Sequence, residues 1–104
     1  FARFGYLCLR GGNWNGKQIL PEGWVDFCRT PSPQSPNGIY GAHFWTIPGS
    51  LGTFECHGAG GQRTTIVPKL DLVIVRLGKT EPHKVGNTVR FCKSLVDVFR
   101  PTAG

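Results

Sequence analysis

The spacing of apolar residues predicts helices near both ends of the chain. Apolar residues recur every three or four positions over residues 1–10, which predicts a first helix that ends at the glycine pair 11–12. The Asn-Gly pair at 15–16 predicts a tight turn. A second helix is expected to begin at Pro21 and to end before Pro31. Its expected apolar face comprises Trp24, Val25 and Cys28.

The middle of the chain is rich in aromatic and β-branched residues and predicts three antiparallel strands. The first covers residues 40–47. The second begins over 53–56, is interrupted by glycines and continues over 63–67, and the third covers 72–77. Because the third has no polar face, both of its sides are expected to be covered. Asn87 is expected to cap a last helix. The buried face of that helix would comprise Val89, Cys92, Leu95, Val96 and Phe99.

Composition narrows the class of protein. The chain has 104 residues, of which 39% are hydrophobic and 17% charged, as in an ordinary folded domain with a modest core. The net charge is +6, but lysine and arginine are scattered singly, so a nucleic-acid partner is not expected. No apolar run approaches the roughly 20 residues of a membrane span. No cofactor is expected.

The cysteines indicate a protein with free thiols. Cys8, Cys28, Cys56 and Cys92 contain no Cys-x-x-Cys pair, and the three histidines share no ligand spacing, so no metal site is expected. Two of the four lie on apolar faces of predicted helices, where a thiol packs as a small hydrophobe. Free thiols favour a reducing compartment such as the cytoplasm, with the periplasm as the alternative. Because the chain opens inside a helical pattern without an initiator methionine, it is expected to be a piece of something longer.

Residues 56–68, CHGAGGQRTTIVP, place His57 beside three glycines at the mouth of a strand. Glycine destabilises the interior of a strand, so a cluster of three glycines here indicates a specific structural or functional role. Glycines let a substrate lie against bare backbone, whose N–H groups can stabilise an oxyanion. The spacing fits no dinucleotide-binding fingerprint, and no P-loop lysine follows. The alternative is a β-bulge or hairpin bend beside a surface histidine.

Three longer stretches carry a resemblance to a known family. They read ARFGYLCLRGGNWNGKQILPEGWV, YGAHFWTIP and HGAGGQRTTIVPKLDLVIVRLG. They resemble the C-terminal part of the serine β-lactamase-like family, which includes class C β-lactamases, penicillin-binding DD-peptidases, related esterases and 6-aminohexanoate-dimer hydrolases. The resemblance extends over nearly the whole chain. The resemblance implies an α/β fold in which an antiparallel sheet is flanked by helices. Residues 1–104 would be a single C-terminal segment of that domain, ordered helix, helix, three strands, helix.

The resemblance also implies a chemistry, which is hydrolysis of a small ester or amide through an acyl-serine intermediate. The family uses a Ser-x-x-Lys pair, a Tyr-x-Asn pair and a Lys-Thr-Gly strand. His57, Gly58 and Ala59 lie where Lys-Thr-Gly would be, and the loss of its Lys and Thr argues against β-lactam substrates. The backbone near Gly60 and Gly61 would form half of an oxyanion hole. No Ser-x-x-Lys or Tyr-x-Asn occurs here, so the nucleophile is expected upstream and the chain alone is expected to be inactive.

The remaining candidates each have two interpretations. Gln62 and Arg63 follow the glycines, and strand alternation points one of them toward the site. Arg63 could equally pair with Glu55. His43 either packs among aromatic residues or contacts the substrate. Trp24 and Trp45 are expected in the core.

A different class of function stays open from the sequence. Three strands taken from a larger sheet would leave an edge or an apolar face uncovered, and such an edge is a template for pairing with another chain. The chain could therefore be a non-catalytic module that self-associates or binds a partner, or it could sit against the missing upstream segment. A dimer or higher assembly is expected in either case.

Overall fold

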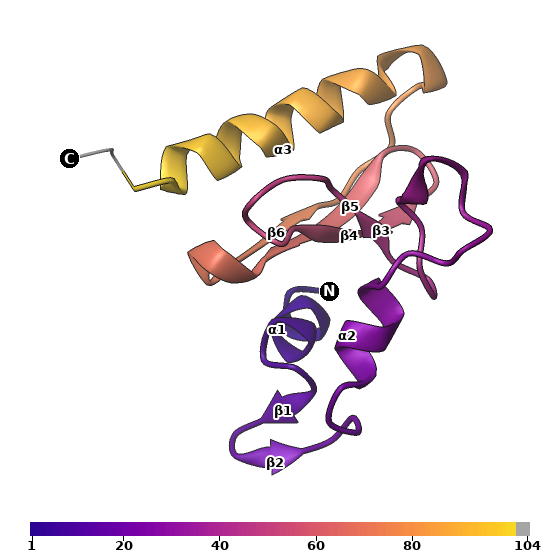
Figure 1. The fold of residues 1–104 in the computed structure, drawn as a ribbon. Helices are drawn as coiled ribbons and strands as arrows, with labels where there is room; N and C mark the ends of the chain where they lie inside the picture. The colour runs from indigo at the N-terminus through magenta and orange to yellow at the C-terminus, as the bar shows by residue number, and fades with distance from the viewer. Residues whose placement is uncertain (102–104) are drawn as a thin grey trace.

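The computed structural model describes residues 1–101 and shows a four-stranded antiparallel sheet between two layers of helix, with a separate two-stranded hairpin. Helix α1 (Ala2–Leu9) and helix α2 (Trp24–Arg29) lie on one side of the sheet, and the long helix α3 (Val85–Phe99) lies on the other (Figure 1). The predicted mixed α/β class is confirmed. In spatial order the strands are β3 (Trp45–Thr46), β4 (Phe54–Gly58), β5 (Gln62–Val67) and β6 (Leu72–Arg76).

Alternation along β4 and β5 sends side chains into two separate cores. Phe54 and Ile66 are register partners on the face toward α1 and α2, and both are buried. On the opposite face, Val67 packs with residues of α3. The first core comprises Cys8, Val25, Cys28, Phe44, Phe54 and Ile66, and the second comprises Val67, Ile74, Cys92 and Val96.

Strand β6 is covered on both faces, as its apolar sequence predicts. Gly5 of α1 lies so close to Val73 that a Cβ added at Gly5 would be 2.6 Å from its Cγ1. On the other face, Ile74 packs into the core beneath α3. The absence of a side chain at Gly5 therefore lets α1 approach the sheet closely.

The predicted Asn-Gly turn is confirmed. It joins β1 (Asn13–Trp14) to β2 (Lys17–Gln18) in a small hairpin of its own. Asn15 and Gly16 have φ angles of 50° and 84°, and a two-residue hairpin turn with φ positive at both central positions requires such residues. Short 3₁₀ turns occur at Pro36–Gly38, Pro68–Leu70 and Pro82–Lys84.

The predicted strand over residues 40–47 is wrong for most of its length. Only Trp45 and Thr46 form β3, and Tyr40 contributes an isolated bridge to Trp45. The segment between them bends because its backbone bonds elsewhere: the N–H of Ala42 donates to the carbonyl of Cys28 at 2.8 Å, and that of Gly41 donates to Phe44 at 2.9 Å. One hydrogen bond to the end of α2 and one within the bend thus replace those of a strand ladder.

Two helix starts differ from the sequence prediction. Helix α2 begins at Trp24, since the N–H of Trp24 closes a turn on the carbonyl of Pro21 at 3.0 Å. Helix α3 begins at Val85, so Asn87 lies inside it and does not cap it. In both cases a turn precedes the helix, and neither helix has a side-chain cap at its start.

The buried faces of α2 and α3 are narrower than predicted. Trp24 is 48% exposed and stacks on the ring of Phe27, so it is not a core residue. On α3, Cys92 and Val96 are buried, but Val89 and Phe99 are exposed. A helix that packs against one sheet buries only the residues along its line of contact, and the residues on either side of that line remain exposed.

The four cysteines are free thiols. Burial raises the pKa of both Cys8 and Cys56 to about 11, with neighbouring charges adding to the effect. A thiol with so high a pKa is almost wholly protonated near neutral pH and is a weak nucleophile. Of the helices in residues 1–101, none is long and apolar enough to cross a membrane.

Candidate functional site

The glycine cluster forms the turn of a hairpin. Ala59, Gly60 and Gly61 connect β4 to β5, and Gly58 pairs with Gln62 across the hairpin. Gly60 and Gly61 have φ angles of 83° and 82°, a region that residues with a side chain rarely occupy. The cluster therefore separates two strands where the sequence predicted one interrupted strand, and the main sheet has four strands.

A guanidinium from β6 holds this turn. Arg76 Nη1 donates to the carbonyl oxygens of Gly60, Gly61 and Gly78 at 3.3, 3.2 and 3.0 Å. The second nitrogen, Nη2, donates to Thr80 Oγ1, and the N–H of Thr80 donates to the carbonyl of Gly60 at 2.8 Å. Because Arg76 and Thr80 hold these carbonyl groups, the peptide planes of the turn have fixed orientations.

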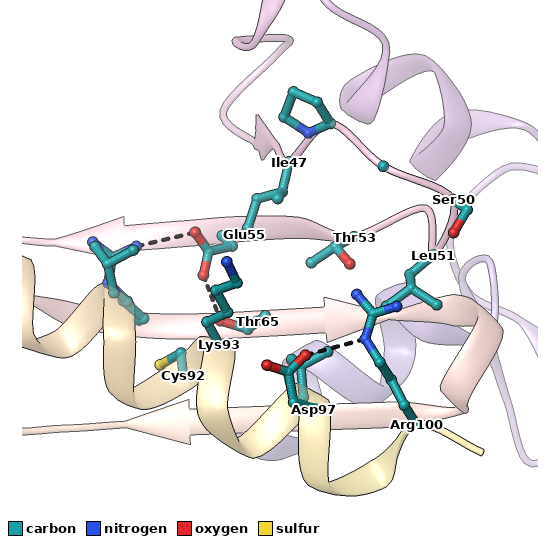
Figure 2. Close-up of a pocket in the computed structure, with 15 residues that line it drawn as sticks. Ile47, Ser50, Leu51, Thr53, Glu55, Thr65, Cys92, Lys93, Asp97 and Arg100 are labelled. Atoms are coloured by element: carbon teal, nitrogen blue, oxygen red, sulfur yellow. Dashed lines mark hydrogen bonds and ion pairs between the residues drawn. The ribbon is translucent and has the colours of Figure 1, made fainter. Parts of the chain in front are cut away.

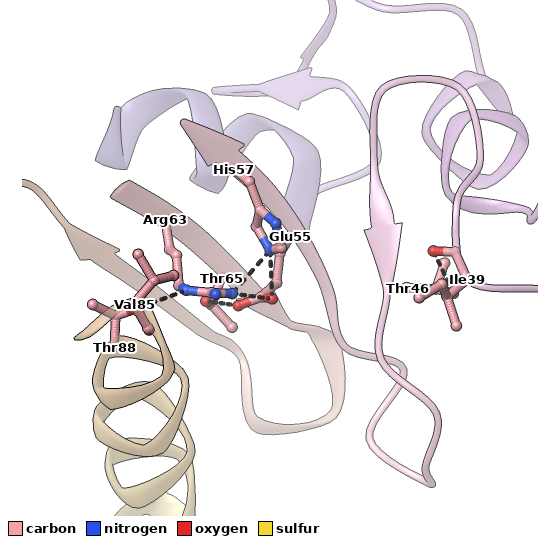
Figure 3. Close-up of polar contacts among 8 residues, drawn as sticks. All are labelled: Ile39, Thr46, Glu55, His57, Arg63, Thr65, Val85 and Thr88. Atoms are coloured by element: carbon pink, nitrogen blue, oxygen red, sulfur yellow. Dashed lines mark hydrogen bonds and ion pairs between the residues drawn. The ribbon is translucent and has the colours of Figure 1, made fainter. Parts of the chain in front are cut away.

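His57 lies on the face of β4 that is turned toward α3. Glu55, two residues earlier, points to the same side, and Arg63 is the cross-strand partner of His57 (Figure 3). His57 Nε2 lies 2.9 Å from Glu55 Oε1 and 2.9 Å from Arg63 Nη1. Arg63 Nη1 donates to Glu55 Oε1 at 3.0 Å. Three charged or titratable groups thus meet at a single point.

Glu55 is the buried centre of this cluster. Its side chain is only 6% exposed, and that of Arg63 is 10% exposed. Thr65 Oγ1 donates to Glu55 Oε2 at 2.5 Å, and Arg63 Nε donates to Thr88 Oγ1 of α3 at 3.2 Å. Burial by itself would raise the pKa of Glu55, but hydrogen bonds from His57 and Thr65 and the charge of Arg63 outweigh it, so the pKa lies below its ordinary value.

Trp45 fixes the plane of the His57 ring. The two rings stack with centroids 5.5 Å apart and planes 15° from parallel. The rings of Trp45 and Tyr40 also pack together, with their centroids 4.6 Å apart. Trp45 is 36% exposed, so it is not the core residue that the sequence predicted. The imidazole is held by stacking and by its Nε2 atom, and its side chain remains 32% exposed.

The other candidate residues divide between the site and its surroundings. Gln62 Nε2 donates to the carbonyl of Ala59 at 3.1 Å and closes the turn. Arg63 pairs with Glu55, one of its two predicted roles. His43 is exposed in the bend with a φ of 72°, so its predicted packing among aromatic residues is wrong. Within residues 1–101, no hydrogen bond, ion pair or ring contact joins it to His57.

Two hollows adjoin the site. The larger, of about 380 Å³, lies between the loop before β4, the sheet and α3, and Glu55 and Arg63 form part of its wall (Figure 2). The smaller, of about 150 Å³, is at the end of β4 beside His57 and Gly58. In the part of the chain that the structure describes, no three His, Cys, Asp or Glu side chains are grouped to hold a metal ion. The arrangement offers an ordered imidazole and a rigid backbone turn beside open space.

Comparison with known proteins identifies the fold. No protein-family model and no curated protein matches the chain. Among solved structures, "Putative 6-aminohexanoate-dimer hydrolase from Bacillus anthracis" matches 92% of this chain with a TM-score of 0.65 and 28% identity. "Crystal structure of putative beta-lactamase from Bacteroides dorei DSM 17855" matches 86% with a TM-score of 0.55 and 15% identity, which bears on the fold alone. Both matches support a β-lactamase-like fold, and the first supports the resemblance to the β-lactamase-like serine hydrolase family.

The resemblance found in the sequence is thereby confirmed. The chain spans 28% of the length of the first of these proteins and 37% of the second. Sequence reasoning found His57, the glycines and the Glu55–Arg63 pair. It missed Trp45 as a stacking partner and the anchoring roles of Thr65 and Arg76. It also missed the contact between Glu55 and His57, for which the Glu-x-His spacing on a strand was a usable signal. For Thr65 and Arg76 the sequence offers none, because their contacts come from other strands.

Glu55 is expected to make stability depend on pH. Its pKa is lower in the folded state, so its ionised form stabilises the fold above the ordinary glutamate pKa of about 4.3, and this contribution is lost as the pH falls through the folded-state pKa. The free energy of unfolding, measured by urea titration at several pH values, should therefore drop on acidification. A Glu55→Gln variant should show a flatter profile. Equal slopes in the two proteins would contradict this role for Glu55.

Proposed function

We propose that this chain forms the C-terminal part of a larger serine hydrolase that cleaves an ester or amide through an acyl-serine intermediate. The observation that carries the proposal is the end of β4, where an ordered His57 and a rigid glycine turn adjoin open space in a fold of this family. In the family, a Lys-Thr-Gly strand lines the substrate at the place that His57, Gly58 and Ala59 occupy here.

The nucleophile of the proposed reaction lies outside residues 1–104. None of the four serines has a lysine three residues later. The thiols of Cys8 and Cys56 have raised pKa values and are poor nucleophiles. An upstream serine would attack the carbonyl carbon of the substrate. Backbone N–H groups near Ala59 and Gly60 would stabilise the negative oxygen that develops, and His57 would hydrogen-bond to the substrate.

The substrate class follows from the absence of lysine and threonine at these positions. Without them there is no cation at residue 57 dedicated to a β-lactam carboxylate, so an uncharged ester or a linear amide is the better substrate. The name of the similar Bacillus anthracis protein refers to a 6-aminohexanoate dimer, and a linear amide of that kind is a reasonable first substrate to test.

The proposal is tested by hydrolysis assays on the full-length protein that contains this chain. Nitrophenyl esters or a linear 6-aminohexanoate amide should be turned over, nitrocefin should not, and mass spectrometry should detect an acyl adduct on an upstream serine. His57→Ala should lower kcat/KM. The control replaces Ser32, Ser35, Ser50 and Ser94 together by alanine and should retain activity. Turnover by purified residues 1–104, lost with His57→Ala but not with the serine changes, would overturn the proposal.

A second candidate is a non-catalytic module that self-associates. The outer side of α3 favours it, since Phe91, Val98 and Phe99 are all more than half exposed at 55%, 74% and 57%, and β6 is an edge strand of the sheet. Exposed apolar groups and a free edge both favour association. A full-length protein that lacks turnover and is dimeric by light scattering would support this candidate over the hydrolase.

A further inference from the structure

One ring nitrogen of His57 is shared between an anion and a cation. Glu55 Oε1, Arg63 Nη1 and His57 Nε2 form a triangle with sides of 2.9, 2.9 and 3.0 Å. A neutral imidazole has one N–H donor and one acceptor nitrogen. If Nε2 carries the proton, it donates to Glu55. If Nδ1 carries it, Nε2 accepts from Arg63, and its lone pair then also faces the carboxylate.

The remaining contacts of the two partners decide between these tautomers. Without Nε2, Arg63 still donates to Glu55 and to Thr88, so it does not depend on the histidine as an acceptor. An unprotonated Nε2, in contrast, would set a lone pair 2.9 Å from the oxygen of a buried carboxylate. That repulsion is costly where water is excluded, whereas a charge-assisted hydrogen bond is favourable there.

We propose that Glu55 is a positioning residue that keeps the proton of neutral His57 on Nε2 and so presents Nδ1 to the substrate as a hydrogen-bond acceptor. The proposal rests on the function proposed above for this site. Trp45 fixes the ring plane and Glu55 fixes the inner nitrogen, so the orientation of the ring has two independent constraints. Among the described residues, no hydrogen bond reaches Nδ1. An acceptor here selects a substrate that offers a donor, such as an amide N–H.

The tautomer is tested by NMR on the full-length protein with ¹⁵N-labelled histidine, using His57→Ala to assign the signal. The neutral ring should be protonated at Nε2. In Glu55→Gln the proton should move to Nδ1, because Arg63 then donates to Nε2. In Arg63→Met, which keeps the carboxylate, the proton should stay on Nε2, and this variant also decides the question if Glu55→Gln does not fold. A wild-type proton on Nδ1, or a shift in Arg63→Met, would overturn the proposal.

Kinetics test whether Glu55 acts through His57. Glu55→Gln should lower kcat/KM by about 10²-fold, the cost of a misplaced group near a reacting centre, but should cause no further loss in a His57→Ala background. Ile66→Val, buried on the opposite face of the sheet, is the control for lost stability and should keep the wild-type kcat/KM. Fully additive losses would mean that Glu55 is structural only. If the wild-type protein hydrolyses nothing, the proposed function fails, and the NMR result alone decides the role of Glu55.

Discussion

A Gly41→Ala variant is expected to lose at least about 3 kcal/mol of stability, at the top of the range for overpacked sites. A Cβ at this position would lie 2.3 Å from the carbonyl oxygen of Cys28 and 2.6 Å from that of Thr30. Both neighbours are backbone atoms at the end of α2, so neither can move aside as a flexible side chain could. Relief of the clash would also strain the hydrogen bond from Ala42 to Cys28, which holds the bend to the helix.

The measurement is the free energy of unfolding from urea titration, with Gly86→Ala as the matched control. Gly86 lies in α3 with nothing near its missing Cβ except Arg90 Nη1 at 4.0 Å. The same substitution there should stabilise the protein by up to about 1 kcal/mol, because alanine favours helix over glycine. If the two variants have the same stability, the close approach at Gly41 does not constrain the fold.

Gly60→Val is expected to lower kcat/KM by about 10²–10³-fold, the loss found when one oxyanion donor is removed. Gly60 has a φ of 83°, which a β-branched residue adopts only with strain. Its backbone also bonds to Thr80 and Arg76, so a shift of this peptide would disturb the whole turn. In the proposed hydrolase, the new side chain would press on Lys79 and Thr80, which lie 3.5–3.7 Å from the missing Cβ, and the altered turn would misalign the backbone donors.

Gly16→Val separates the cost of backbone strain from the loss of function. Gly16 also lies in a hairpin turn, with a φ of 84° and nothing within 4 Å of its missing Cβ. It belongs to the β1–β2 hairpin, which is separate from the main sheet. Both variants should lose a similar 1–3 kcal/mol or so of stability, but only Gly60→Val should lose activity. A folded Gly60→Val protein with full kcat/KM would make the glycine cluster purely structural.

Local patterns in the sequence were sufficient to predict the elements whose conformation depends only on residues nearby in the chain. The helical spacing over residues 1–10 predicts α1, the Asn-Gly pair at 15–16 predicts its turn, and the apolar run at 72–77 predicts β6, all of which the structure contains. The spacing of Glu55 and His57 likewise places both side chains on one face of a strand. In each case the period of a helix or strand, or the φ preference of a turn residue, is an intrinsic property of that segment.

Only the tertiary structure decided the features that depend on distant parts of the chain. The segment 40–44 bends, despite its strand-like composition, because the N–H of Ala42 donates to the carbonyl of Cys28 in α2 and that of Gly41 donates to Phe44 within the segment. The glycines turn the chain back on itself, and the resulting register sets Arg63 beside His57, so that one carboxylate, one guanidinium and one ring nitrogen meet. The opposite charges of Glu55 and Arg63 could suggest that they pair. The position of His57 between them follows from strand pairing. Hydrogen bonds between strands fix the distances among these side chains, and no local repeat in the sequence encodes those distances.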